Sequence, residues 1–203
     1  MNYGQVRDQI MKLLNQYTIA GAAVEPSYNN QQDYLERIPG LVNDAMMEIA
    51  TTARKIPALL NLNDLGGEIV GDLVRYALPD DFYQFVSGSV TRAGNGGLIH
   101  TNCFTVQGRK YLVLPKEETA NCTVTYYRYP VLLADKPKDS DELDNEPETH
   151  YAVACYVAAH LLAHDDLALS AMYHNAYEDK LNKMSPGVEM EARPVEDVYQ
   201  FFG

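Results

Sequence analysis

The sequence predicts an α+β fold: a helical bundle of about four helices, interrupted by a small antiparallel β-sandwich or barrel insertion, with an extended C-terminal tail. Two observations predict it. Apolar residues recur every three or four positions near both ends of the 203-residue chain, which is the spacing of amphipathic helices. Between them, from about residue 68 to residue 130, the chain is rich in Val, Tyr, Phe, Thr and Gly with frequent turn signals, as in short strands.

The first helix is predicted over Tyr3–Tyr17. Its apolar residues, including Val6, Ile10 and Leu14, fall on one face at helical spacing. Residues 20–30 contain Gly, Pro and an Asn pair, so they are expected to form a loop.

A second helix is predicted over Gln31–Lys55, where apolar residues again repeat at threes and fours. Pro39-Gly40 lies inside this pattern. Because proline lacks an N–H and clashes with the preceding turn, we expect the helix to be kinked or split near Ile38.

The β insertion is predicted from short runs of β-branched and aromatic residues. The sequences QGRK (107–110) and AGNGG (93–97) are plausible hairpin turns, because Gly accepts the positive φ that tight hairpins need. The strands are expected in four segments: 68–79, 82–92, 103–115 and 122–130.

Residues 135–148 hold seven acidic residues against two lysines, together with two prolines, which predicts an exposed linker. Pro147 suits the first turn of a third helix reaching about His164. A fourth helix follows from about Asp166 to Lys183. We therefore expect a helical domain over 1–60 and 135–184, a β insertion domain over 61–134 and a tail over 185–203.

The segment HYAVACYVAAHLLAHDD (150–166) raises the question of a metal site. His160 and His164 are one helical turn apart, a spacing that can chelate zinc, but the intervening residues lack the glutamate of an HExxH site. The simpler interpretation is packing: the two histidines flank a buried stripe, and Asp165 or Asp166 caps the fourth helix. We favour helix–turn–helix packing and expect no metal, no cofactor and no catalytic residues.

Composition narrows the function further. The net charge is −12, which disfavours binding to nucleic-acid phosphates. No stretch approaches the roughly 18 apolar residues of a membrane span, and the N-terminus lacks a signal-peptide pattern, so we expect a protein made and kept in the cytoplasm, without a membrane. The three cysteines form no CxxC pair, and the GxSxG, GxxxxGK[ST] and GxGxxG motifs are absent. The sequence therefore offers no set of catalytic residues that would support an enzyme.

The order of these pieces resembles the head-to-tail adaptor (connector) proteins of tailed bacteriophages, in particular the tail tubular protein A type. The resemblance is spread over segments 34–60, 75–90, 124–133 and 141–181. Its most specific parts are the YALPDDF turn (76–82) and the acidic DELD entry to the third helix, followed by DD…Y…YE…L. These are packing and turn features rather than a catalytic signature.

The resemblance implies a virion structural protein at the neck, assembled in the host cytoplasm. Such proteins form a homo-oligomeric ring, usually of twelve copies, that docks under the portal protein and offers a platform to the tail or nozzle protein. Genomic DNA passes through the lumen without sequence-specific binding. An acidic lumen would keep DNA from sticking, although the negative charge could equally serve solubility alone.

The resemblance also gives the C-terminal segment a role, because in such proteins it reaches onto the portal. Its apolar residues would be the anchors in this chain: Val195, Val198, Tyr199, Phe201 and Phe202. The alternative is that this tail folds back on its own helices. Two other functions also remain open, namely another neck protein such as a stopper or head-completion protein, and a helical-bundle metalloprotein using His160 and His164.

Overall fold

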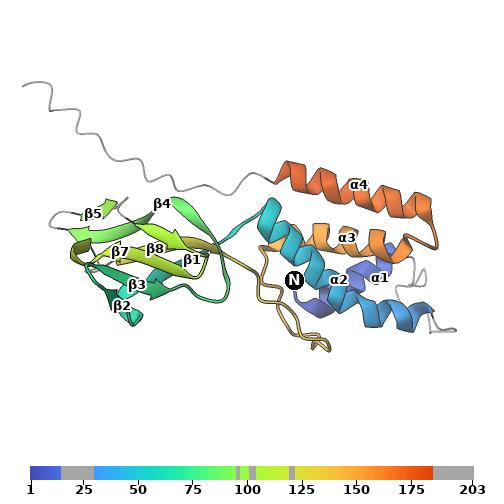
Figure 1. Cartoon of the computed structure of the whole chain (residues 1–203). Helices are drawn as coiled ribbons and strands as arrows, with labels where there is room; N and C mark the ends of the chain where they lie inside the picture. Colours follow the sequence, from blue (N-terminus) through green and yellow to red (C-terminus); the bar gives the residue numbers. More distant parts are fainter. Residues whose placement is uncertain (15–29, 95–96, 101–103, 119–121, 185–203) are drawn as a thin grey trace, which may run out of the picture. The chain divides into compact units, whose positions relative to one another are not determined.

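The computed structural model describes residues 1–14, 30–94, 97–100, 104–118 and 122–184 (Figure 1). The chain forms two compact units. A helical unit comprises Met1–Ile56 and the segment from Tyr129 to the end of the last helix, and a β unit comprises Pro57–Arg128. The predicted α+β fold, four helices with antiparallel sheets between them, is confirmed; the predicted tail lies outside the described residues.

The helical unit is built around one central helix. Ten of the 13 residues of α3 are buried, and α3 contacts each of the other helices of the unit. Figure 1 shows α3 lying between α2 and α4. The apolar stripe that the two histidines were predicted to flank is buried: its residues are Ala154, Val157, Ala158 and Leu161. The four helices are α1 (Tyr3–Leu13), α2 (Asn30–Thr52), α3 (His150–Leu162) and α4 (Leu167–Lys183).

Helix α2 is not split at its proline, contrary to one of the two outcomes that we expected. It continues through Pro39 from Asn30 to Thr52. The residues on both sides of the proline, Ile38 and Val42, are fully buried in the core of the unit. Their burial offsets the roughly 3 kcal/mol that an interior proline costs a helix, so tertiary packing overrides the local signal.

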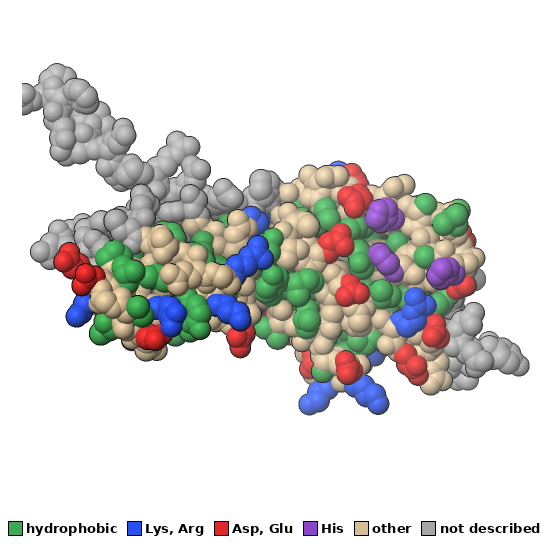
Figure 2. Space-filling view, viewed as in Figure 1, with side chains coloured by type: hydrophobic (Ala, Val, Ile, Leu, Met, Phe, Trp, Pro, Cys, Tyr) green, Lys and Arg blue, Asp and Glu red, His purple; other side chains and the backbone are tan. Residues whose placement is uncertain are grey.

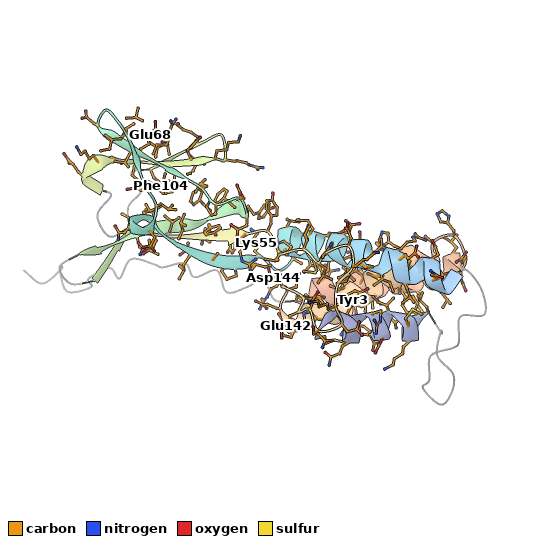
Figure 3. The ribbon with its side chains drawn as sticks, turned by 90° about the horizontal axis from the view of Figure 1, so that it is seen from below. Tyr3, Lys55, Glu68, Phe104, Glu142 and Asp144 are labelled. Atoms are coloured by element: carbon orange, nitrogen blue, oxygen red, sulfur yellow. The ribbon has the colours of Figure 1, made fainter. Side chains whose placement is uncertain are left out.

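Most side chains of the acidic segment are exposed, as expected, but the segment packs against the helical unit and is not a free linker. Residues 130–149, hereafter the strap, lie against the helical unit. The carbonyls of Asp139 and Asp141 accept hydrogen bonds from the backbone N–H groups of Gly4 and Tyr3, and Leu143 is only 6% exposed. Figure 3 shows Glu142 and Asp144 of the strap beside Tyr3. Sequence patterns could not predict these contacts, because the paired residues are more than 130 positions apart in the chain.

Side chains on α1 and α2 hold the strap at further points. Asn43 forms two bonds to one residue of the strap: its Nδ2 donates to the carbonyl of Leu133 (2.9 Å), and its Oδ1 accepts from the N–H of Leu133 (2.8 Å). Arg7 forms an ion pair with Asp139 at 2.6 Å. Arg54, just after α2, reaches both Glu146 (2.6 Å) and Glu148 (3.1 Å). Three of the acidic residues that suggested solvent exposure, Asp139, Glu146 and Glu148, thus form ion pairs with arginines of the helical unit.

His150 is buried where the strap meets α3, with 3% of its surface exposed. Its Nε2 lies 3.0 Å from the carbonyl oxygen of Asn145, so this nitrogen carries the proton, and its Nδ1 lies 2.6 Å from the amino group of Met1. Burial lowers the pKa of His150 below its ordinary value of 6.5; the bond to Asn145 opposes this, and the amino-terminal charge adds to it. The neutral ring is therefore the form that fits the fold.

This burial predicts a loss of stability in mild acid. Because the pKa of His150 is lower in the folded than in the unfolded chain, the unfolded chain takes up the proton first as the pH falls through 6.5. The free energy of unfolding should then decrease by at most about 1.4 kcal/mol per pH unit from this residue. Urea denaturation followed by circular dichroism at 222 nm between pH 5.5 and 8 measures this. His150→Gln should flatten the pH dependence, and an unchanged slope would contradict the prediction; the exposed His164→Gln is the control.

The β unit is a sandwich of two four-stranded sheets, which decides between the two predicted alternatives. Their inner faces form one core that includes Val74, Val90, Leu112 and Val124. The first sheet has the order β1-β8-β4-β5, with β1 (Ile56–Asn61), β8 (Cys122–Arg128), β4 (Phe82–Gly94) and β5 (Gly97–His100). The second has the order β2-β3-β7-β6, with β2 (Glu68–Val70), β3 (Leu73–Ala77), β7 (Tyr111–Pro115) and β6 (Thr105–Gln107).

Both predicted hairpin turns are confirmed. In QGRK, Gly108 and Arg109 have φ of 59° and 57°, as a turn between two twisted strands requires, and Lys110 N–H donates to the carbonyl of Gln107. In AGNGG, β4 pairs with β5 antiparallel, with Gly94 opposite Gly97. The QGRK turn makes β6 and β7 neighbours in the second sheet, whereas β3 and β7 pair in that sheet although they are far apart in the sequence.

Candidate interaction surfaces

The apolar anchors predicted in the tail cannot be placed on a surface. Val195, Val198, Tyr199, Phe201 and Phe202 all lie outside the described residues.

The two histidines of the helix–turn–helix segment are both exposed. His160 is near the end of α3, where its Nδ1 donates to the carbonyl of Tyr156 (2.9 Å) and its ring stacks on that of Tyr156 at 4.1 Å. His164 lies in the turn that follows. Asp166 caps α4, since its Oδ1 accepts from the N–H groups of Ala168 and Leu169. The cap agrees with the packing interpretation of this segment.

Among the residues that the structure describes, no third metal ligand joins these histidines. In the part of the chain that the structure describes, no group of three or more His, Cys, Asp or Glu side chains could hold a metal ion. His174 instead lies beside Glu178, one turn further along α4, with 4.0 Å between its Nε2 and Oε1 of Glu178. Cys155 is fully buried in α3, and burial raises the pKa of its thiol, which disfavours the thiolate that a metal or a substrate would need.

Behind this surface, α2, α3 and α4 are joined by a buried tyrosine. The hydroxyl of Tyr177 on α4 donates to Glu48 of α2 (2.9 Å), and its ring contacts Tyr156 of α3 edge-on at 5.2 Å. Burial, followed by the bond to Glu48, raises the pKa of Tyr177. Tyr34 makes a similar bond to Asp165, and burial raises its pKa to about 12. These hydroxyls act as fixed donors that tie α2 to α4 and its preceding turn, rather than as acids.

The negative charge is concentrated in the helical unit. Residues 1–56 and 129–184 contain 17 Asp and Glu against nine Lys and Arg, whereas residues 57–128 contain seven against six. Figure 2 shows carboxylates and histidines spread over the visible face of the helical unit. The β unit is close to neutral, so the two units present different chemistry to a partner.

Large apolar side chains are exposed on both units. On α4, Leu167 and Met172 are 76% and 51% exposed. On the β unit, Ile69, Val70 and Leu73 around the β2–β3 turn are 62%, 52% and 43% exposed. The apolar side chains gathered around the β2–β3 turn are of the kind found at protein–protein contacts. Sequence periodicity did not single these residues out, because their exposure depends on which neighbours the fold gives them.

Behind its apolar tip, the β2–β3 hairpin is linked to β7 by side-chain contacts. Arg75 donates through Nε and Nη2 to Oε2 of Glu68, opposite it in the register (3.1 and 2.5 Å). The same guanidinium lies 4.6 Å from the centre of the Tyr111 ring on β7. The chain of Glu68, Arg75 and Tyr111 crosses three strands, so the hairpin can dock without being reordered first.

Comparison with known proteins identifies one family. The model of the family described as SU10 adaptor protein matches residues 1–196, which include both units. No curated protein matches the chain. No helix within the described ranges is long and apolar enough to cross a membrane.

Proposed function

Because the chain belongs to the SU10 adaptor protein family, we propose that it is the structural head-to-tail adaptor of a tailed phage. In this proposal it forms a ring of twelve copies under the portal protein, extends the DNA channel and provides the platform for the tail or nozzle protein. It acts through interfaces, as a virion component of the neck, and performs no catalysis. The tail tubular protein A subtype is part of the same proposal, as is assembly in the host cytoplasm.

The observation that carries the proposal is the extent of the family match, which covers 196 of the 203 residues and therefore the whole of both units. The described surfaces support it. Exposed apolar side chains such as Leu167 and Ile69 suit protein contacts, and the described histidines assemble no metal site. These features favour an adaptor over the metalloprotein alternative; the stopper or head-completion alternative solves the same docking problem, and no described feature favours it.

The channel part of the proposal concerns the helical unit. DNA that slides through a lumen should meet carboxylates rather than lysines, because basic side chains would bind its phosphates. Most of the −12 net charge belongs to the helical unit and least to the β unit. We therefore assign the acidic lumen to the helical unit, and a basic inner wall in the assembled ring would contradict this assignment.

The test is binding to the cognate portal with and without the tail. Removal of residues 194–203 should abolish portal-dependent ring assembly, measured by mass photometry, because each buried aromatic or aliphatic anchor contributes about 1.5–3 kcal/mol before ordering costs. A double variant, Glu196→Gln with Asp197→Asn, keeps the apolar anchors and should still assemble. Metal analysis of the same sample separates the alternatives: a monomer with one zinc per chain that ignores the portal would overturn the proposal.

A further inference from the structure

We infer that the second sheet of the β unit continues from one copy of the chain to the next, with β2 of one copy pairing with β6 of its neighbour. The inference rests on the ring proposed above and adds the surface through which its copies meet. It starts from the two edges of that sheet. All three residues of β2 and all three of β6 are exposed, and no further strand of the described β unit pairs with either.

Both edges expose an apolar residue where an edge strand is usually protected by charge. Ile69, the middle residue of β2, is 62% exposed, and Val106, the middle residue of β6, is 40% exposed. The register places Ile69 opposite Val74, and Val106 opposite Leu112, both of which are core residues. Ile69 and Val106 therefore point to the same, inner face of the sheet, at its two opposite edges.

The directions of β2 and β6 also allow them to pair between copies. The pairs β2–β3, β3–β7 and β6–β7 are all antiparallel, so β2 and β6 run in opposite directions. A neighbouring copy in the same orientation, as in a cyclic ring, therefore presents its β6 antiparallel to β2. Pairing Ile69 with Val106 keeps inner faces together and places Glu68 opposite Gln107 and Val70 opposite Thr105. The pairing therefore requires no change in the direction of either strand or in the face that its side chains occupy.

Charge favours this neighbour over a copy related by a two-fold axis. The β6–β7 turn carries Arg109 and Lys110, both exposed, and in this register it lies beside the start of β2 in the next copy. Glu68 is at that position, and the bonds from Arg75 both end on its Oε2, so its Oε1 can accept a further bond. A two-fold contact would instead place β2 against β2 or β6 against β6, and Glu68 would then lose Arg109 and Lys110 as neighbours.

The paired strands are short, so the contact is expected to form mainly when copies are already held side by side. Three residues on each strand bury far less than a stable dimer needs. Docking on the portal raises the effective concentration of neighbouring copies and lets each one use both edges. The pairing should then be portal-dependent at low protein concentration.

Disulfide trapping in the full-length chain tests the pairing. The double variant Ile69→Cys, Val106→Cys, made in a Cys103→Ser background, is mixed with the cognate portal and mildly oxidised. Opposite residues of paired strands are within disulfide distance, so covalent dimers and a ladder of higher multimers are expected on a non-reducing gel. The other two cysteines, Cys122 and Cys155, are buried and should not contribute.

The matched control shifts one residue: Ile69→Cys with Thr105→Cys places the thiols on opposite faces and should give at least ten-fold less ladder. Equal ladders from both variants, or none from either at high protein concentration and with portal, would overturn the inference. Portal binding measured on the same samples separates the two proposals. Rings on the portal without the ladder refute the edge pairing alone, and a ladder without portal binding refutes the adaptor function alone.

Discussion

Replacing Gly67 by alanine should destabilise the β unit by about 1–3 kcal/mol, the usual range for an overpacked core. A Cβ atom at this position would lie 2.5 Å from Cγ1 of Val74 and 2.9 Å from Cε1 of Tyr76. Both neighbours are buried in the sandwich, and the branched Val74 side chain has few rotamers to choose from, so neither can move away easily.

Gly66 supplies the matched control for this prediction. A Cβ atom there meets nothing within 4 Å, and its φ is not in the left-handed region, so Gly66→Ala should be neutral or slightly stabilising. Hydrogen exchange of the full-length chain, measured on peptides from β3 and β7, reports the stability of the β unit specifically. If both variants exchange like the unchanged protein, Gly67 is not required for close packing.

Replacing Asn43 by alanine should lower the free energy of unfolding of the helical unit by about 1–3 kcal/mol, because two hydrogen bonds to Leu133 disappear at once. The amide side chain of Asn matches the backbone of Leu133. Its Nδ2 donates to the Leu133 carbonyl and its Oδ1 accepts from the Leu133 N–H, so both backbone groups are paired. The strap should also become more accessible to proteases near residues 131–135.

The neighbouring position gives the control for Asn43. Asp44 is exposed on the same helix and, among the described residues, forms no hydrogen bond or ion pair with the strap. Asp44→Ala should therefore leave the protease sensitivity of the strap unchanged while slightly favouring the helix. The chain contains no tryptophan, so urea denaturation is followed by circular dichroism at 222 nm. An Asn43→Ala variant as stable as the Asp44→Ala variant would show that the strap is held elsewhere.

Local patterns were sufficient to predict the elements of the fold. The helical spacing of Val6 and Ile10, the cap at Asp166 and the glycine of the QGRK turn each act through residues a few positions apart, and the structure confirms each of them. The alternation of side chains predicted the strands in the same way, although β1 and β5 were missed. β1 (Ile56–Asn61) begins just after the predicted end of the second helix, where no element was predicted, and β5 is only four residues long.

Long-range pairing could not be predicted in this way. The strap looked like a solvated linker because its charge is evident in sequence, while its partners Arg7 and Arg54 are about 90 to 130 positions away. The exposed apolar residues Ile69 and Val106 look like ordinary strand residues, and only the sheet order reveals that they lie at open edges. The predicted anchors in the tail stay a prediction.

The neighbouring positions of β1 and β8 have a consequence for how such a chain can change over generations. The β unit begins with β1 and ends with β8, and these two strands are adjacent in one sheet, so the first and last strands of the insertion are neighbours. A short loop could therefore replace it without pulling the helices apart. The β unit is therefore suited to exchange: recombination can replace it with a different unit, and so change the surface that this part of the chain carries, while the sequence of the helical bundle stays as it is.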